Sequence, residues 1–340
     1  MNLMSALSPA KHAKDWPLAD EVLPSHLLTR LAYYARLAPS THNTQPWKFV
    51  ISGREIDVLA DKGRWMRIAD SLRRELHISM GCTIESLRIA ADFAGCSTSV
   101  SYFPIPHNEE LVARIVVGES GTERASAVPD LLPHAITRRT NHRKFDPAQP
   151  VKDSERRAIY TCFDNPVVAV HLITGRPALD RLADLEREAD RELFADPAFR
   201  SELAAWIGEG SLGTSWLISK LGQFAVEALP LGRPLAQIDS GRVASAPLAI
   251  LLSTPHDDPI EHVHVGEAYM RIALTAESLA LRIQPVSQVL ELPQTRQRVA
   301  EAAGLEDRFA QHLFRIGHAQ AEPAIRRRRP LADIALRGDL

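Results

Sequence analysis

Apolar positions along the chain repeat with two spacings, and each spacing predicts a different element. Between residues 25 and 37, apolar side chains recur every three or four positions, which predicts a helix that ends before Pro39. Alternating or continuous apolar runs predict strands instead. The helical pattern returns at 78–94, 154–162, 179–189 and 267–281, and the strand patterns fall at 47–52, 56–60, 97–103, 111–117, 167–174 and 247–253. This order of elements predicts an α+β fold with layered sheets.

A polar, proline-containing stretch, ESGTERASAVPDLLPH at 119–134, divides the chain into two halves. The order of helices and strands partly repeats after it. We therefore expect a loose N-terminal arm at 1–20, a first half at 21–120, a linker at 121–134, and a second half at 135–335 that contains a helical insert at 200–240.

Two segments support an internal duplication. When MGCTIESLRIAADFAG (80–95) is written over VGEAYMRIALTAESLA (265–280), Gly81 pairs with Gly266 and small residues share one face. We expect two helices that start near these glycines and pack closely at a pseudo-twofold centre. Similarity between any two helices rich in leucine and alanine is the alternative explanation.

Composition narrows the class of protein. The 340 residues are 45% hydrophobic and 24% charged, and the formal net charge of -2 argues against a nucleic-acid partner. Cys82, Cys96 and Cys162 show neither disulfide nor metal spacing, which favours a reducing compartment. No apolar run has the length of a signal peptide or a membrane span, so we expect a cytoplasmic protein without a membrane partner.

Two stretches carry the candidate chemistry. APSTHNTQPWKF (38–49) places small polar residues before a rigid Pro-Trp exit, which suits either a flat polar heterocycle or an ordinary helix-to-strand connection. RRTNHRKF (138–145) concentrates guanidinium groups, which suit a phosphate or form a solvated basic face. A further basic run, RRRR at 326–329, could add donors to the same phosphate.

Other patterns predict little chemistry. The acidic and histidine residues of PHDDPIEHVHV (255–265) are expected to form a solvated loop rather than a metal site. The chain has no G-x-S-x-G nucleophile context and no glycine-rich dinucleotide fingerprint. A nicotinamide cofactor would therefore visit the protein transiently.

The two stretches resemble those of a known family. APSTHNTQPWKF is similar to the A-P-S-x-x-N-x-Q-P-W signature of nitroreductase-like FMN flavoproteins, and RRTNHRKF is similar to their basic phosphate segment. The segments 61–95 and 189–206 further resemble the single-chain Acg-like subgroup, in which two half-units are fused. This resemblance covers most of 25–335. It implies a nitroreductase-like fold, with an antiparallel-type sheet flanked by helices in each half.

The resemblance also implies the cofactor and its residues. Each motif occurs in one half only, so one FMN per chain is expected between the halves of a monomer that mimics a dimer, with further self-association left open. His142 stands where a second arginine is expected, so either His142 or Arg143 would complete the phosphate site. The implied phosphate and ribityl residues are Arg138, Arg139, Thr140, Asn141, His142, Arg143, Arg326 and Arg328. The implied ring residues are Pro39, Ser40, Thr41, Asn43 and Gln45, with Val286, Ser287 and Gln288 near the flavin N5.

Two functions follow from the resemblance. The first is an NAD(P)H-dependent FMN oxidoreductase that reduces a small nitroaromatic or quinone-like acceptor. The second is an FMN-sequestering protein with little turnover, whose flavin is covered by the insert. The insert residues could form that lid or a simple core: Trp206, Leu212, Trp216, Leu217, Leu221 and Phe224, with Gly208, Gly210 and Gly213 as possible hinges.

Overall fold

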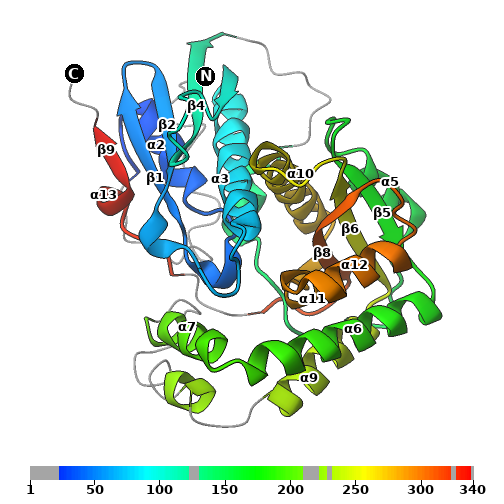
Figure 1. The fold of residues 1–340 in the computed structure, drawn as a ribbon. Coiled ribbons are helices and arrows are strands. Elements are labelled where there is room, and N and C mark those ends of the chain that lie inside the picture. Colours follow the sequence, from blue (N-terminus) through cyan, green and yellow to red (C-terminus); the bar gives the residue numbers. More distant parts are fainter. Residues whose placement is uncertain (1–22, 122–129, 210–221, 228–231, 323–326, 338–340) are drawn as a thin grey trace.

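The chain forms two sheets with helices between and below them (Figure 1). The computed structural model describes residues 23–121, 130–209, 222–227, 232–322 and 327–337, so the predicted arm at 1–20 lies outside the described residues. The first sheet has the order β3-β4-β2-β1-β9, and the second has the order β5-β6-β8-β7. The strands are β1 (Trp47–Ser52), β2 (Glu55–Ala60), β3 (Cys96–Tyr102), β4 (Leu111–Ser120), β5 (Ala169–Ile173), β6 (Leu248–Thr254), β7 (Arg282–Pro285), β8 (Phe309–Gly317) and β9 (Ala335–Arg337).

Neighbouring strands are antiparallel except for β1 and β9, which run parallel. Burial follows the sequence pattern, because β1 buries alternate residues whereas β6 is buried along its whole length. The prediction of an α+β fold with antiparallel-type sheets flanked by helices is confirmed. The β9 strand, from the end of the second half, completes the first sheet.

Two long helices, α3 (Arg74–Phe93) and α10 (Pro259–Ser278), lie side by side between the sheets (Figure 1). A Cβ atom on Gly81 would lie 1.9 Å from the Val263 carbonyl oxygen, and one on Gly266 would lie 2.0 Å from the Ile78 carbonyl oxygen. Because each carbonyl belongs to the residue three positions before the opposite glycine, the contact is symmetric. The predicted packing of these two helices is confirmed, and it depends on both glycines.

The expected start of the second helix is wrong, and the expected loop at 255–265 is correct only for residues 255–258. Helix α10 begins at Pro259, and the Asp258 side chain caps it by accepting a hydrogen bond from the Glu261 amide at 2.9 Å. Both glycines therefore lie inside their helices rather than at the start. His262 lies 2.8 Å from an Asp257 carboxylate oxygen. No group of three potential metal ligands occurs in the described ranges.

The other helices surround this pair. In Figure 1, α6 and α9 run together below both sheets, with α7 beside them and with α11 and α12 above α6. The linker prediction falls mainly on residues outside the described ranges, but its last residues enter α4. These helices are α2 (Leu27–Ala35), α4 (Leu132–Thr137), α5 (Asp153–Tyr160), α6 (Arg176–Ala195), α7 (Pro197–Gly208), α9 (Gly232–Ala244), α11 (Gln288–Glu291), α12 (Pro293–Ala302) and α13 (Leu331–Ile334).

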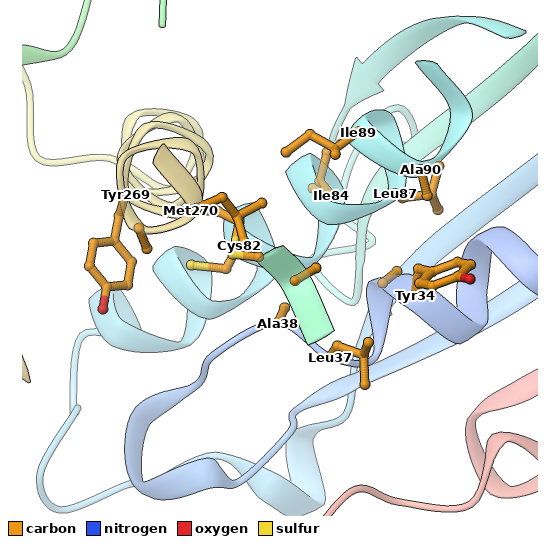
Figure 2. Packing of buried hydrophobic residues seen from close by; sticks show 14 of the residues in the cluster. Tyr34, Leu37, Ala38, Cys82, Ile84, Leu87, Ile89, Ala90, Tyr269 and Met270 are labelled. Carbon is orange, nitrogen blue, oxygen red and sulfur yellow. The ribbon is translucent and has the colours of Figure 1, made fainter. Parts of the chain in front are cut away.

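One hydrophobic core joins the two halves. It contains buried residues of β1, β2, α3, β4, β6, α10 and β8. Figure 2 shows part of this cluster, in which Cys82 of α3 lies beside Met270 of α10 and the Tyr269 ring stands on the neighbouring face. Because apolar burial is continuous across the α3–α10 contact, the halves stabilise one another. No helix among the described residues is long and apolar enough to cross a membrane.

Candidate active site

A cleft of about 690 Å³ opens where the two halves meet the insert helices. Its floor comes from α3 and α10, through Ile78, Ser79, Cys82 and Tyr269. Most residues that the sequence singled out line this cleft: Pro39, Ser40, Thr41, Asn43, Arg138, Arg139, Thr140, His142, Val286, Ser287, Gln288 and Arg328. The polar loop before β1 and the basic segment after the linker therefore converge on one cavity.

The polar loop holds an unusual backbone conformation. His42, Asn43 and Gln45 have positive φ angles of 47°, 56° and 51°. For residues other than glycine, this region costs about 1–2 kcal/mol each. Two hydrogen bonds help to hold the loop in place. Thr41 Oγ1 donates to Glu75 Oε2 at 3.0 Å, and the backbone amide of Gln45 donates to Ser40 Oγ at 2.9 Å. The loop is thus a strained and externally supported wall of the cleft.

The C-terminal segment supplies further support. Arg328 NH1 donates to Asn43 Oδ1 at 2.6 Å, and Arg328 NH2 donates to the Leu37 carbonyl at 2.9 Å. The Arg329 amide donates to Gln45 Oε1 at 2.8 Å. Asn43 and Gln45, which the sequence assigned to the ring, therefore also anchor the C-terminal segment. Gln45 itself does not line the cleft, and Arg326 lies outside the described residues.

The basic segment begins with a buried guanidinium. Arg138 is only 6% exposed, and its Nε has no hydrogen-bond partner among the described residues. Arg139 NH1 donates to the Ile136 carbonyl at 2.8 Å, which fixes the start of the segment. Thr140 pairs with Ile283 as a parallel β-bridge, so the segment continues alongside β7. The Arg138 side chain is thereby held at the cleft surface, with its Nε free of hydrogen bonds to the described part of the chain.

Three guanidinium groups line this end of the cleft, those of Arg138, Arg139 and Arg328, and Arg36 adds its charge from behind. Burial lowers the pKa of Arg328 well below its usual range, and the charges of Arg138, Arg139 and Arg36 lower it further. Among the described residues, the charges that shift this pKa are those of arginines. Buried like charges repel one another, so an anion among them would relieve the repulsion. The donor set therefore fits a phosphate group.

The remaining residues of the basic segment divide by role. Asn141 is fully buried, and its Nδ2 donates to the Gln320 carbonyl at 2.7 Å, so its side chain supports the chain path. Arg143 is exposed outside the cleft, with NH1 on Gln320 Oε1 at 3.0 Å, whereas His142 lines the cleft. Of the two alternatives for a further phosphate contact, this geometry favours His142.

The segment before α11 presents a second set of candidates. The Val286 amide donates to the Leu313 carbonyl at 2.8 Å, so that donor is already used inside the second sheet. Ser287 and Gln288 follow at the start of α11, and both line the cleft.

Arg315 is a structural residue that the sequence reasoning missed. It is fully buried on β8, its Nε donates to Gln284 Oε1 at 2.7 Å, and its NH2 donates to the Arg143 carbonyl at 2.7 Å. Its guanidinium lies 4.2 Å from the Phe145 ring centre. Burial lowers the pKa of Arg315 to about 9. An arginine within the apolar run LFRIG was the signal that could have identified it.

The cleft floor contains two further polar residues that were missed. The rings of Tyr269 and His312 lie 4.4 Å apart, and both residues line the cleft. Burial lowers the pKa of His312 to about 4, so its ring is neutral at pH 7. Neither residue belongs to a sequence motif, because only the tertiary fold brings α10 and β8 together here.

The insert forms one wall of the cleft, but through other residues than expected. Trp206 is 8% exposed and packs in a separate core cluster with Arg64 over its ring at 4.9 Å, whereas Phe224 is 66% exposed. The proposed lid residues Leu212, Trp216, Leu217 and Leu221 and hinges Gly210 and Gly213 lie outside the described residues. The insert side of the cleft is lined by Phe194, Leu203, Ile207, Val226 and Leu235, together with Glu186, Asp239 and Arg242.

Comparison with known proteins adds relatives along most of the chain. No family model matches it. The Mycobacterium tuberculosis protein Rv3131 is 28% identical over 300 residues, covering 83% of this chain and 82% of Rv3131. The acg protein of the same organism is 26% identical over 340 residues, covering 93% and 97%. PigM of Serratia is 24% identical over 320 residues, covering 82% and 86%.

The names of all three relatives assign them to the NAD(P)H nitroreductases. The NfnB nitroreductase structure from Mycobacterium smegmatis is 21% identical, with 58% of this chain and 92% of the NfnB chain covered, and the TM-score is 0.38. The match to acg runs along nearly the whole of both chains. Together with the motifs, it shows that the chain is similar to the nitroreductase-like superfamily and, within it, to the single-chain acg-like proteins.

Proposed function

We propose that this chain is an NAD(P)H-dependent oxidoreductase that holds one FMN in the cleft and reduces a nitroaromatic or quinone-like acceptor there. It would act in the cytoplasm as a monomer whose halves mimic a dimer. The relatives named as NAD(P)H nitroreductases support the reaction class.

The observation that carries this proposal is that the guanidinium cluster and the polar loop line one cavity. Arg138, Arg139 and Arg328 would hold the FMN phosphate, with Thr140 and His142 beside it. Charge-assisted hydrogen bonds contribute about 1.5–3 kcal/mol each, so a few of them retain a cofactor without a covalent bond. Pro39, Ser40 and Thr41 would lie against the ring, where short side chains leave a flat space.

Bound FMN would supply the hydride chemistry, and the chain would position and shield it. Ser287 and Gln288 line the cleft where the resemblance places the flavin N5, so their polar groups would orient the ring. Apolar side chains of α6, α7 and α9 exclude water from the opposite wall. The same wall favours the second candidate function, an FMN-sequestering protein with little turnover, because it restricts access.

A single site is supported by the pseudo-twofold relation between α3 and α10. Cys82, on the cleft floor, follows Gly81 directly, and its counterpart after Gly266 is Glu267. Glu267 is 7% exposed. Its carboxylate accepts a hydrogen bond from Tyr102 Oη at 2.8 Å, and His264 Nδ1 lies 3.0 Å from its other oxygen. Side chains of this chain therefore surround the position that corresponds to Cys82, which supports a single flavin site.

Flavin release and spectroscopy test the proposal. The purified chain, reconstituted with FMN, should show flavin absorbance at one FMN per chain, and light scattering should give the mass of one chain. Stopped-flow mixing with NADPH should bleach the flavin within seconds, and a quinone should restore it. Absence of flavin binding contradicts the proposal, and two FMN per chain contradicts the single site. A bound flavin unchanged by NADPH over many minutes indicates sequestration.

A further inference from the structure

We propose that the carboxyl group of Glu186 delivers a proton to the electron acceptor in the cleft. This inference rests on the proposed function and assigns a catalytic residue that no sequence motif marks. Three observations support it. Glu186 lines the cavity, its carboxylate is hydrogen-bonded to α11, and the neighbouring acids Asp190 and Glu291 have no hydrogen-bond partner among the described residues.

Glu186 lies at the boundary between the insert wall and the candidate ring site. It lines the cleft while only 2% exposed. Its Oε2 accepts a hydrogen bond from the Val289 amide at 3.1 Å. Val289 directly follows Gln288, so the carboxyl group is fixed beside the segment assigned to the flavin N5. An acceptor stacked on the ring would lie within reach of this group.

The residues around Glu186 are mostly acids. Asp190 lies one helical turn further along the same face of α6, is fully buried, and has no hydrogen-bond partner for either carboxylate oxygen within the described ranges. Both carboxylate oxygens of Glu291, on α11, also have no hydrogen-bond partner among the described residues. Asp239 of α9 also faces the Glu186 carboxyl group, but Asp239 forms an ion pair with Arg242 at 2.6 Å. No ion pair to Glu186 forms within the described part of the chain.

Carboxylates this close and this buried cannot all be ionised. Burial raises the pKa of Glu186 well above its usual value, and the charges of Asp190, Asp239 and Glu291 raise it further. Burial and Asp239 raise the pKa of Asp190 to about 7. Burial and these neighbouring acids therefore favour the protonated form of Glu186, which is the form that can donate a proton. A metal ion is not implied, because the described residues contain no suitable ligand group.

The proton balance of the reaction requires such a donor. A hydride from the reductant brings two electrons and one hydrogen nucleus to a quinone, so a neutral hydroquinone needs one more proton. The O–H bond of Glu186 breaks as an O–H bond forms on the acceptor oxygen, and Glu186 is left as a carboxylate. Water in the cleft, which Glu186 lines, then restores the proton, and no further oxidant or reductant is needed.

Glu186→Gln tests the role, because glutamine keeps the volume and the acceptor for the Val289 amide. The matched control is Glu188→Gln, on the same helix but exposed and paired with Arg298 at 2.6 Å. In E186Q, FMN affinity and the NADPH reduction rate should stay within about twofold, whereas reoxidation by a quinone should slow about 100-fold. In E188Q all three should match the unmodified chain. If reoxidation by the quinone slows by less than threefold in E186Q, the proposal is overturned.

Two further measurements exclude a purely structural role. Infrared spectra of the cofactor-free chain at pH 7 should show a protonated carboxyl band that E186Q lacks, and an identical band in both overturns the proposal. In Asp190→Asn the repulsion on Glu186 falls, so the loss of reoxidation rate at high pH should move to lower pH, and an unmoved profile also overturns it. If instead the unmodified chain binds no FMN, the proposed function fails, while the infrared result still reports on Glu186.

Discussion

Gly81 and Gly266 face each other so closely that a Cβ atom on Gly81 would lie 2.9 Å from the Gly266 Cα, and one on Gly266 would lie 2.8 Å from the Gly81 Cα. Helix backbones approach this closely only where both residues lack side chains. The contact sets the spacing between the two sheets, and both helices contribute to the cleft floor.

Gly81→Ala should therefore separate the helices. The added methyl group meets the Val263 backbone carbonyl, which cannot rotate away, so the free energy of unfolding should fall by about 3 kcal/mol or more. Gly241→Ala is the control, because no atom lies within 4 Å of the position in α9 and alanine favours a helix by about 1 kcal/mol. Urea denaturation measures both. Equal stability of the two variants would contradict the contact.

Arg138→Met should weaken FMN binding by about 10–100-fold, because one charge-assisted hydrogen bond to the phosphate is lost while the alkyl stem is kept. Riboflavin lacks the phosphate, so its affinity should be unaffected. Arg157→Met, at an exposed position outside the cleft, is the matched control. Fluorescence titration of each variant with FMN and with riboflavin gives the affinities to compare. Equal losses for FMN and riboflavin would place the phosphate elsewhere.

Tyr102→Phe should lower the free energy of unfolding by about 1–3 kcal/mol, because the buried Glu267 carboxylate loses a hydrogen bond of 2.8 Å. Flavin stoichiometry should remain one per chain, since the phenyl ring still fills the space. Tyr160→Phe, at a residue that is 56% exposed, should leave stability unchanged. A second bound flavin in the Tyr102 variant would show that this hydroxyl alone closes the other site.

Asp190 should make stability depend on pH. Its pKa rises on folding from 3.8 to about 7, so the folded chain binds the proton more tightly and stability falls as pH rises between these values. Above pH 7, each unit by which folding raises the pKa lowers the free energy of unfolding by about 1.4 kcal/mol. Asp190→Asn should be more stable than the unmodified chain at pH 8 and equal to it below pH 4. Denaturation at both pH values tests this, with the exposed Asp184→Asn as control.

The sequence predicted elements well where the signal is local. The strands β1 and β2 and the glycine pair in α3 and α10 follow from periodicity and small-residue spacing. The start of α10 was missed because Asp257 and Asp258 look like loop residues until the Asp258 cap is seen to initiate the helix. The length of this helix reflects capping and packing against α3 as well as propensity.

The candidate site was predictable only where a motif marks it. Pro39 and Arg138 belong to motifs and line the cleft. Gln45 belongs to a motif too, but its side chain binds Arg329 rather than facing the cavity. Glu186 carries no motif, because its significance depends on Val289 and other distant residues that meet it only after folding.

The pairing of β9 with β1 has a consequence for biosynthesis. Phe49 pairs with Ala335, and Arg329 donates to the carbonyl oxygens of Gln45 and Trp47. While residues 327–337 are still inside the ribosome, the strained turn at 42–45 lacks these restraints. We therefore expect FMN to bind after this segment has been translated and has paired with β1. A ribosome-stalled chain that ends before this segment should remain colourless.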